Sequence, residues 1–432
     1  MSQKQRKTKA PMNSPPKELP RKRSGIGTKL GPIIALLGIV VLFGLLDSLF
    51  GNGQYLSMRN LLVIVTESSL IAVPALGMTL IIIAGGIDLS VGTAITLCST
   101  LLVVALRDGC QFDIPIPFTE SVVALSLAPY AWMTTPVALT LAVLAGLLCG
   151  FANGLIVSWF KIVPFVVTLG TMTAFLGIGL ILAEETTVEV KRENVPSWIY
   201  NLSSTRPAIE TCAICDGSGN DPAATAGECP KCNGAGLVKE PDGEVQCWIC
   251  KGSGTTITKC TNCRGNGETP VYTHFGFIPR FPLGVWLALV LAAAVGVLLH
   301  LTVFGRHVFA IGSSEATARL CGLNITKTKI MVYTIAGFFV AVGGIYNYSY
   351  IHLSNPGDGL GIELKVIAAV VLGGGSLSGG RGSVIGTLAG ALIMESIYSG
   401  CVQLSLGDPM QKIILGMIII GAVILDKQRE KS

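Results

Sequence analysis

The chain consists of long apolar segments separated by short polar breaks. Apolar runs of about twenty residues are typical of helices that cross a membrane. Such segments are 31–50, 61–84, 89–106, 136–158, 164–183, 283–303, 328–351, 363–375, 381–400 and 409–425. We therefore expect an all-α polytopic membrane protein with about ten transmembrane helices. The segment 363–375 is short enough for a broken or re-entrant helix, so nine or ten crossings both fit the pattern.

Charge is scarce and unevenly distributed. Only 13% of the residues are charged, against about 25% in an ordinary soluble protein. Residues 1–29 carry nine Lys or Arg and the single acid Glu18, which is typical of a disordered segment on the cytoplasmic flank of a first span. A nucleic-acid-binding arm is the alternative. Basic flanks are routine beside membrane spans, so we expect no nucleic-acid partner.

The same pattern divides the chain into five parts. They are a disordered basic tail (1–30), a first transmembrane half (31–184), a cysteine-rich insertion (205–272), a second transmembrane half (281–426) and a short tail (427–432). Ten crossings from a cytoplasmic N-terminus return the C-terminus to the cytoplasm. They also place 304–329 there, as its four Lys or Arg against Glu315 favour. The segment 184–282 then falls outside, and that assignment depends on the number of spans.

Four quoted stretches carry the motifs of one transporter family. They are ALGMTLIIIAGGIDLSVG, ending at Gly92, GFANGLIVSWFKIVPFVVTLGTM from Gly150, FGRHVFAIGSSEATARLCGLN from Phe304 and IELKVIAAVVLGGGSLSGGRGSVIGTLAGALI from Ile362. Together they resemble the permeases of ribose-type ATP-binding-cassette importers, a family that includes xylose, galactose and autoinducer-2 permeases. The resemblance covers the chain apart from 1–30 and the region around 185–275.

This resemblance implies a function and a set of partners. The chain is expected to be a multi-pass permease subunit in a bacterial inner membrane, translocating a monosaccharide or similar small polar solute. The implied partners are a cytoplasmic ATP-binding subunit, an extracytoplasmic solute-binding protein and a second permease subunit, in a homo- or heterodimer surrounded by lipid. The sequence contains no G-x-x-x-x-G-K-[ST] phosphate loop, so we expect no ATPase site and no enzyme activity in this chain.

The segment between Gly305 and Lys329 is predicted to contain a short amphipathic helix. Its apolar residues are spaced for one helical face: Val308, Phe309, Ile311, Leu320 and Leu323. The resemblance gives this segment the role of coupling to the ATPase, through Gly305, Arg306, Gly312, Glu315, Ala316, Arg319 and Gly322. An interfacial helix lying on lipid is the alternative.

A few ionisable residues fall at membrane depth, where charge is costly and often functional. Glu67 and Glu395 are the candidates for the pathway or a subunit interface, whereas Lys365 lies near a span end and is expected to reach the headgroups. Asp88 is a third candidate, but a simpler role is the N-cap of a helix starting at Leu89.

Glycines form two further patterns. The segments 85–90 and 374–380 each follow a span, and their likeness suggests a duplicated transporter core or two unrelated glycine-rich turns. Gly146, Gly150 and Gly154 are spaced four apart, which favours close helix packing over contact with a solute.

The insertion carries four C-x-x-C-x-G-x-G repeats. Their cysteines are Cys212, Cys215, Cys229, Cys232, Cys247, Cys250, Cys260 and Cys263. Two such pairs supply the four thiolates of a structural zinc site, so we expect two Zn²⁺ ions in a small, loop-rich, zinc-stabilised domain. Outside the cell, disulfides compete with zinc. The other five cysteines, at 98, 110, 149, 321 and 401, are interpreted as small packing residues.

The repeats closely resemble the cysteine-rich domain of DnaJ-type chaperones. That resemblance implies that the outer pairs, Cys212/Cys215 and Cys260/Cys263, share one zinc ion and the inner pairs share the other. We expect the insertion to be a protein-contact module on the external face.

Two alternatives to a sugar importer stay open. A branched-chain amino-acid permease belongs to a related family, although the GGIDLSVG and GGGSLSGGRGS segments favour the sugar branch. An ion-coupled secondary carrier would work without an ATPase and would need charge relays in the membrane, for which Glu67 and Glu395 are the only support.

Overall fold

The computed structural model describes residues 26–115, 122–128, 130–203 and 281–431, together with short strands between residues 208 and 279. The basic tail up to residue 25 and all eight cysteines of the insertion lie outside the described residues.

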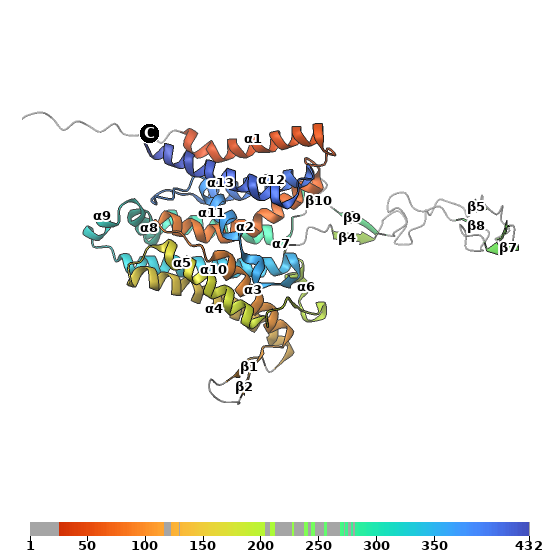
Figure 1. The fold of residues 1–432 in the computed structure, drawn as a ribbon, viewed down its shortest axis with the longest axis horizontal. Coiled ribbons are helices and arrows are strands. Elements are labelled where there is room, and N and C mark those ends of the chain that lie inside the picture. The colour runs from red at the N-terminus through yellow and green to blue at the C-terminus, as the bar shows by residue number, and fades with distance from the viewer. Residues whose placement is uncertain are drawn as a thin grey trace, which may run out of the picture.

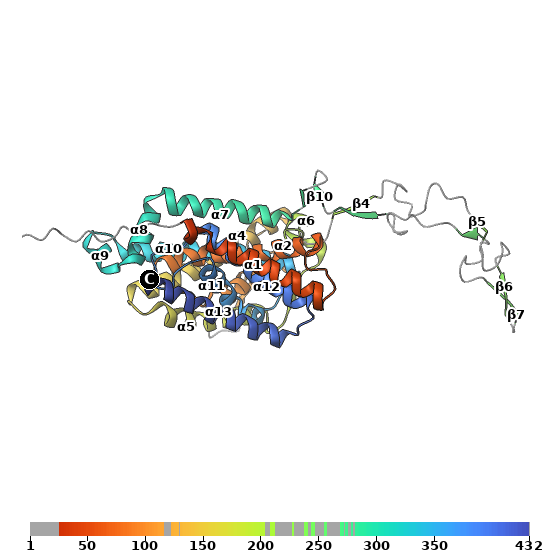
Figure 2. The same ribbon diagram turned by 90° about the horizontal axis from the view of Figure 1, so that it is seen from above.

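Helices packed side by side form the body of the molecule (Figures 1 and 2). They are α1 (Ile26–Phe50), α2 (Met58–Ile83), α3 (Val91–Arg107), α4 (Ala131–Trp159), α5 (Pro164–Leu182), α7 (Leu283–Leu301), α10 (Ile325–Ile351), α11 (Ile362–Leu372), α12 (Val384–Gln403) and α13 (Asp408–Lys431). Short elements join them: α6 (Ser197–Tyr200), α8 (Val303–Ser313), α9 (Glu315–Leu320) and the 3₁₀ turns Arg192–Asn194 and Pro356–Gly359.

The helices carry the composition of membrane spans. Within the described residues, seven are long and apolar enough to cross a membrane: α1, α2, α4, α5, α7, α10 and α12. The prediction of a polytopic helical membrane protein is therefore confirmed. The segment expected at 363–375 becomes α11, eleven residues long, or about 16 Å at 1.5 Å per residue, only about half of a hydrocarbon core.

Helices α4 and α10 pack against each other over an extended contact. A Cβ atom on Gly150 would stand 3.0 Å from the Cα atom of Gly337, and one on Gly154 would stand 3.0 Å from the Cα atom of Ile330. The backbones approach this closely because neither position carries a side chain. The predicted packing role of the glycine stripe is confirmed.

The bundle has two distinct ends. At the first, which we call the α8 end, lie α8, α9, the end of α2 at Ile83 and the start of α10 at Ile325. At the opposite end, which we call the far end, α10 stops at Ile351 and α7 begins at Leu283. In Figure 1 the C-terminal end of α13 lies at the α8 end, whereas the strands of the insertion extend from the far end.

The insertion leaves the bundle at one narrow point. The Gly284 amide donates a hydrogen bond of 2.8 Å to the Leu202 carbonyl, so the chain entering the insertion lies against the chain leaving it. The Tyr346 hydroxyl donates to the Gly284 carbonyl at 2.6 Å, and the Ser203 amide donates to the Ser349 hydroxyl at 2.8 Å. Both ends are thereby fixed to α10.

Strands within the insertion pair in a nested order. β4 (Ala208–Thr211) pairs with β9 (Glu268–Val271), β5 (Gly227–Glu228) with β8 (Thr255–Thr256), and β6 (Leu237–Glu240) with β7 (Gly243–Gln246), all antiparallel. The remaining hairpins are β10 (Thr273–His274) with β11 (Ile278–Pro279) and β1 (Gln111–Pro115) with β2 (Val122–Ser126). At the far end, β3 (Val188–Glu189) pairs with β12 (Leu353–Ser354).

Two predictions about single residues are wrong. Helix α3 begins at Val91 with Ser90 as its N-cap, so Asp88 is not the cap. Instead the Asp88 carboxylate accepts hydrogen bonds from the Ser90 amide at 2.8 Å and the Ser90 hydroxyl at 2.6 Å, one turn before the helix starts. Among the five scattered cysteines, Cys321 is exposed rather than packed, because it follows the last turn of α9.

Candidate functional site

A polar, solvent-exposed surface, which we call the α8–α9 surface, covers the α8 end and is formed by α8, α9 and the first turn of α10. Three consecutive N-caps define its helices. The Thr302 hydroxyl accepts from the Gly305 amide at 3.2 Å, the Ser314 hydroxyl from the Thr317 amide at 3.3 Å, and the Asn324 side chain from the Lys327 amide at 2.9 Å. Each cap satisfies a backbone donor that a helix start leaves unpaired, so the sequence breaks this segment into α8, α9 and the first turn of α10.

The residues predicted for coupling lie on this surface in two groups. Arg306, Glu315, Ala316, Arg319 and Gly322 are exposed, whereas Gly305 is buried and Gly312 is half-buried. Gly322 has a φ of +79° and terminates α9, since its amide bonds to the Arg319 carbonyl, a conformation that favours glycine.

The predicted apolar face is correct except at Leu320. Val308 and Ile311 are buried, and Leu323 packs beside them. Leu320 is 90% exposed because α9 is a separate helix after the Ser314 cap, which breaks the spacing assumed for one continuous helix. An exposed leucine beside Arg319 gives the α8–α9 surface an apolar contact point that the sequence pattern had placed inside.

One ion pair holds α9 against α10, and a second lies within α9. The Glu315 carboxylate lies 2.7 Å from the Lys329 amino group and 3.3 Å from the Arg319 guanidinium. The hydrogen bond from Lys329 is the main cause that holds the pKa of the Glu315 carboxyl below its ordinary value, against the opposing effect of partial burial. Glu315 is therefore ionised at neutral pH and orients the exposed helix.

Beneath α8, the glycine-rich segments 85–90 and 374–380 contact each other, and we call them the glycine breaks. The Gly380 amide donates a hydrogen bond of 2.9 Å to the Ile83 carbonyl, at the end of α2. A Cβ atom on Gly312 would stand 2.6 Å from the Gly380 amide nitrogen, and one on Gly379 would stand 3.0 Å from the Cα atom of Gly85. The end of α8 therefore contacts both breaks, one before α3 and one before α12.

A cavity of about 240 Å³ lies toward the far end, between α2, α10, α11 and α12. We call it the Glu67–Glu395 pocket. Its polar lining residues are Glu67, Asn347, Tyr350, Asp358, Lys365, Glu395 and Tyr398. The structure thus brings together the two glutamates proposed from sequence. Lys365, expected at the headgroups, lines the pocket instead because α11 is short and begins at Ile362.

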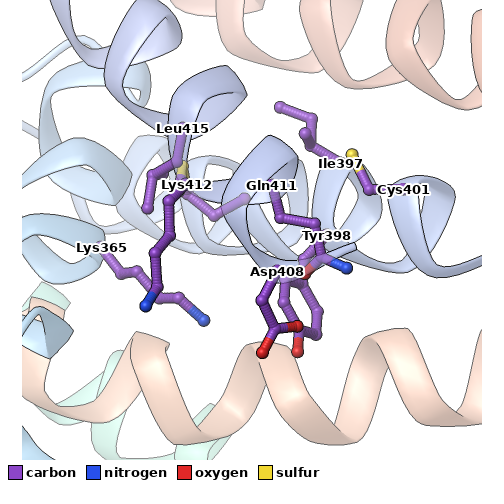
Figure 3. Close-up of a pocket in the computed structure, with 9 residues that line it drawn as sticks. Lys365, Ile397, Tyr398, Cys401, Asp408, Gln411, Lys412 and Leu415 are labelled. Carbon is purple, nitrogen blue, oxygen red and sulfur yellow. The ribbon is translucent and has the colours of Figure 1, made fainter. Parts of the chain in front are cut away.

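Contacts within this pocket involve four helices. The Tyr350 hydroxyl of α10 donates a hydrogen bond of 2.5 Å to the Glu67 carboxylate of α2. The Lys365 amino group lies 3.9 Å from the Glu395 carboxylate and 4.6 Å from the centre of the Tyr398 ring. A second cavity of about 230 Å³ adjoins the first, since Lys365 and Tyr398 line both (Figure 3).

Asp88 belongs to a separate buried cluster. The Asn153 side-chain amide of α4 contacts the Asp88 carboxylate at 3.3 Å and the Ser90 hydroxyl at 2.8 Å. These bonds fix the break between α2 and α3 against α4. Asp88 does not line either described cavity, which favours a structural role for it. The eight insertion cysteines, predicted as metal ligands, lie outside the described residues.

Comparisons with known proteins agree on one family. Residues 60–423 match the family described as branched-chain amino acid transport system / permease component. The ribose import permease protein RbsC of Bacillus subtilis (strain 168) is 29% identical, over 94% of both chains. The autoinducer 2 import system permease protein LsrC of Photorhabdus luminescens is 27% identical, over 91% of this chain and 89% of its own.

A third relative is the ribose import permease protein RbsC of Escherichia coli (strain K12), which is 26% identical over 92% of this chain and 94% of its own. No solved structure matches. The matched residues run from the start of α2 into α13 and so include the α8–α9 surface, the glycine breaks and the Glu67–Glu395 pocket. The chain therefore belongs to the branched-chain amino acid transport system / permease component family.

Proposed function

We propose that this chain is the transmembrane subunit of an ATP-binding-cassette importer that translocates a monosaccharide or a similar small polar solute. The observation that carries the proposal is the α8–α9 surface. It exposes Arg306, Arg319 and Leu320 at one end of a membrane bundle. The two glycine breaks, one between α2 and α3 and the other between α11 and α12, lie directly beneath it. The relatives named for ribose and autoinducer-2 import support the solute class.

In this mechanism the chain performs no covalent chemistry. An ATP-binding subunit binds α8 and α9 from the cytoplasm. When that subunit closes on ATP, it moves Gly312 against Ile83 and Gly380. That displacement shifts α2 and α12, which both line the Glu67–Glu395 pocket. A second permease subunit completes the pathway, and a solute-binding protein delivers the solute at the far end.

The membrane orientation follows from the same proposal. With the α8 end in the cytoplasm, both termini are cytoplasmic and the insertion is extracytoplasmic, in a bacterial inner membrane. In this proposal the seven long apolar helices, together with α3, α11 and α13, make ten passages between the two ends.

Reconstitution tests the function directly. The purified chain is placed in liposomes with its ATP-binding subunit inside and its binding protein outside, and uptake of D-ribose, D-xylose, D-galactose and L-leucine is measured. We expect uptake of a sugar that requires ATP. Uptake of leucine alone would favour an amino-acid permease, and uptake driven by an ion gradient without the ATP-binding subunit would favour a secondary carrier.

We further propose that the insertion binds two Zn²⁺ ions, as the cysteine pattern predicts. The nested strand pairs support the predicted sharing. Thr211 directly precedes Cys212 and pairs with Glu268, five residues after Cys263. Pairing of β4 with β9 therefore joins the flanks of the outer cysteine pairs.

The inner pairs are flanked in the same way. Gln246 directly precedes Cys247 and pairs with Leu237, five residues after Cys232. Four thiolates are the ligand set of a structural zinc site. Metal analysis of the full chain tests this, with an expected two zinc ions per chain.

Cysteine-to-serine variants test which cysteine pairs share a zinc ion. Replacing Cys212 and Cys215 by serine should remove one zinc ion and expose the thiols of Cys260 and Cys263 to alkylation, while the inner pairs stay protected. Exposure of Cys229 and Cys232 instead would contradict the nested scheme. Absence of zinc with no reactive thiols would show disulfides.

We propose that the zinc domain contacts the solute-binding protein at the far end. A deletion of 205–272 should keep ATP-dependent sugar transport by the bundle but weaken capture of the binding protein. Unchanged capture and transport would refute this role.

A further inference from the structure

The Glu67–Glu395 pocket is an open space inside a membrane bundle, lined by charged, aromatic and aliphatic side chains. Glu395 lies on the membrane-spanning α12 and is only 4% exposed. Its carboxyl group is in hydrogen-bond contact with that of Glu67. Burying a carboxylate in a membrane costs at least about 2.5 kcal/mol on insertion scales. A fold retains such groups where they have partners or a function, so the pocket requires an account of both.

The groups in the pocket are not fully paired with one another. At 3.9 Å, the distance between the Lys365 amino group and the Glu395 carboxylate exceeds a direct hydrogen bond. A hydroxyl group placed between such groups can bond to both, as bridging water does. A purely structural ion pair would close this gap by a small movement of the lysine side chain.

Tyrosine rings add a different kind of surface. Tyr350 and Tyr398 line the same space and are 41% and 38% exposed. An aromatic face accepts apolar C–H groups, while carboxylates, amides and hydroxyls accept or donate hydrogen bonds. The volume of about 240 Å³ is below the usual range of about 300–1,000 Å³ for sites that hold drug-sized ligands, so a smaller solute fits.

The charged groups of the lining give the pocket a net negative charge. Three carboxyl groups, on Glu67, Asp358 and Glu395, line the pocket together with one amino group, on Lys365. Because the Glu67 and Glu395 carboxyl groups hydrogen-bond to each other, they hold one proton between them, and two carboxylates remain against one ammonium group. The adjoining cavity adds Asp408 and Lys412, which leave the balance unchanged (Figure 3). In a low-dielectric surrounding this excess of negative charge repels anions strongly.

We propose that the Glu67–Glu395 pocket is a solute-contact site on the outer half of the pathway, which accepts a neutral polyhydroxylated solute and rejects anions. Glu67, Glu395 and Lys365 hold hydroxyl groups, and the two tyrosines contact the carbon skeleton. This inference rests on the proposed importer function, which it deepens by naming the residues and the charge of the solute.

The sign of the net charge in the pocket can be measured without a transport assay. Asn347, half-buried in the lining, is replaced by cysteine, and labelling at position 347 is followed by peptide mass spectrometry. We expect a cationic methanethiosulfonate to react about tenfold faster than an anionic one, relative to their rates with a free thiol. Glu67→Gln with Glu395→Gln should abolish the preference.

A matched carboxyl group serves as the control. Glu363 is buried on α11, two residues from Lys365, but its carboxylate accepts a hydrogen bond from the Gly361 amide at 3.0 Å and does not line the pocket. Glu363→Gln should keep the cationic preference. Equal labelling rates in the wild-type lining, or an unchanged preference in the double variant, would overturn the charge assignment.

The assembled importer tests contact with the solute. The sugar that the wild-type complex accumulates from the panel above should slow labelling at position 347 when presented on its binding protein, and Lys365→Met should remove this protection. ATP-dependent uptake by the wild type without any protection would overturn the proposed site and leave the importer function standing. Failure of wild-type uptake, with the charge preference intact, would instead overturn the importer function itself.

Discussion

The Gly380 amide donates a 2.9 Å hydrogen bond to the Ile83 carbonyl, and this bond joins two breaks that are almost three hundred residues apart in the chain. Gly312 of α8 lies directly against it. Because α2 ends at one break and α12 begins after the other, a push on α8 reaches both helices at once. In the proposed mechanism this bond links the α8–α9 surface to the helices that line the pocket.

Replacing Gly312 by alanine should uncouple the importer. Its Cβ atom would stand 2.6 Å from the Gly380 amide nitrogen, so α8 must shift away from the breaks. We expect binding of the ATP-binding subunit to persist and solute uptake per ATP hydrolysed to fall about fivefold, equivalent to about 1 kcal/mol. Gly296→Ala on α7, where a Cβ atom meets nothing within 4 Å, is the control. Equal coupling ratios in both variants would argue against the link.

Replacing Leu320 by aspartate should weaken capture of the ATP-binding subunit. The side chain is 90% exposed, and a buried apolar anchor in an interface contributes about 2 kcal/mol. We expect a loss in affinity of tenfold or more in a pull-down titration of the purified subunits. Thr326→Asp, at an exposed position in the first turn of α10, introduces the same charge nearby and should change affinity far less. A similar loss in both would indicate general charge repulsion.

The α8–α9 surface should loosen in acid. Because the Glu315 pKa is depressed in the folded protein, its stabilising effect is present above the unfolded value of about 4.3 and is lost as the pH falls through the lower folded value. Lys329→Met removes the main cause of the depression, so the loss should occur at higher pH. Hydrogen exchange of peptides covering 303–325, followed from pH 3 to pH 7, measures this.

The control for Lys329→Met is Lys327→Met, which leaves both Glu315 ion pairs intact. The effect will be small in free energy, because Glu315 is partly exposed and surface ion pairs are screened by solvent. Identical exchange profiles for the two lysine variants would show that the ion pair does not order α9.

Replacing Gly150 by alanine should destabilise the bundle. The added Cβ atom would stand 3.0 Å from the Cα atom of Gly337 and would contact the Tyr333 carbonyl, so α4 and α10 must separate. Overpacking of this kind costs about 1–3 kcal/mol, which should appear as a lower thermal unfolding midpoint in detergent. Gly170→Ala, where the added atom has open space, should leave the midpoint unchanged.

Local patterns in the sequence predicted much of this architecture. Apolar length predicted the long helices, because a segment must satisfy its backbone internally to lie in lipid. Spacing predicted the Gly150 stripe, and rarity at membrane depth singled out Glu67 and Glu395. Both glutamates line one cavity, although no local pattern relates residues on α2 and α12.

What the sequence did not predict depends on packing between distant segments. Lys365 reaches the pocket because α11 is short, and Leu320 is exposed because a cap at Ser314 separates α9 from α8. Asp88 was placed at a helix start that lies further along the chain, since Ser90 caps α3. Each case turned on where a helix starts, the feature that periodicity specifies least.

The hydrogen bond between Gly284 and Leu202 also bears on how far the insertion can be altered. Because both ends of the insertion are held side by side on α10, a shorter or longer segment can start and finish at the same two points. Surface positions of this kind tolerate insertions and deletions best. We therefore expect a replacement of the cysteine-rich segment by one of another length to leave the helices in place.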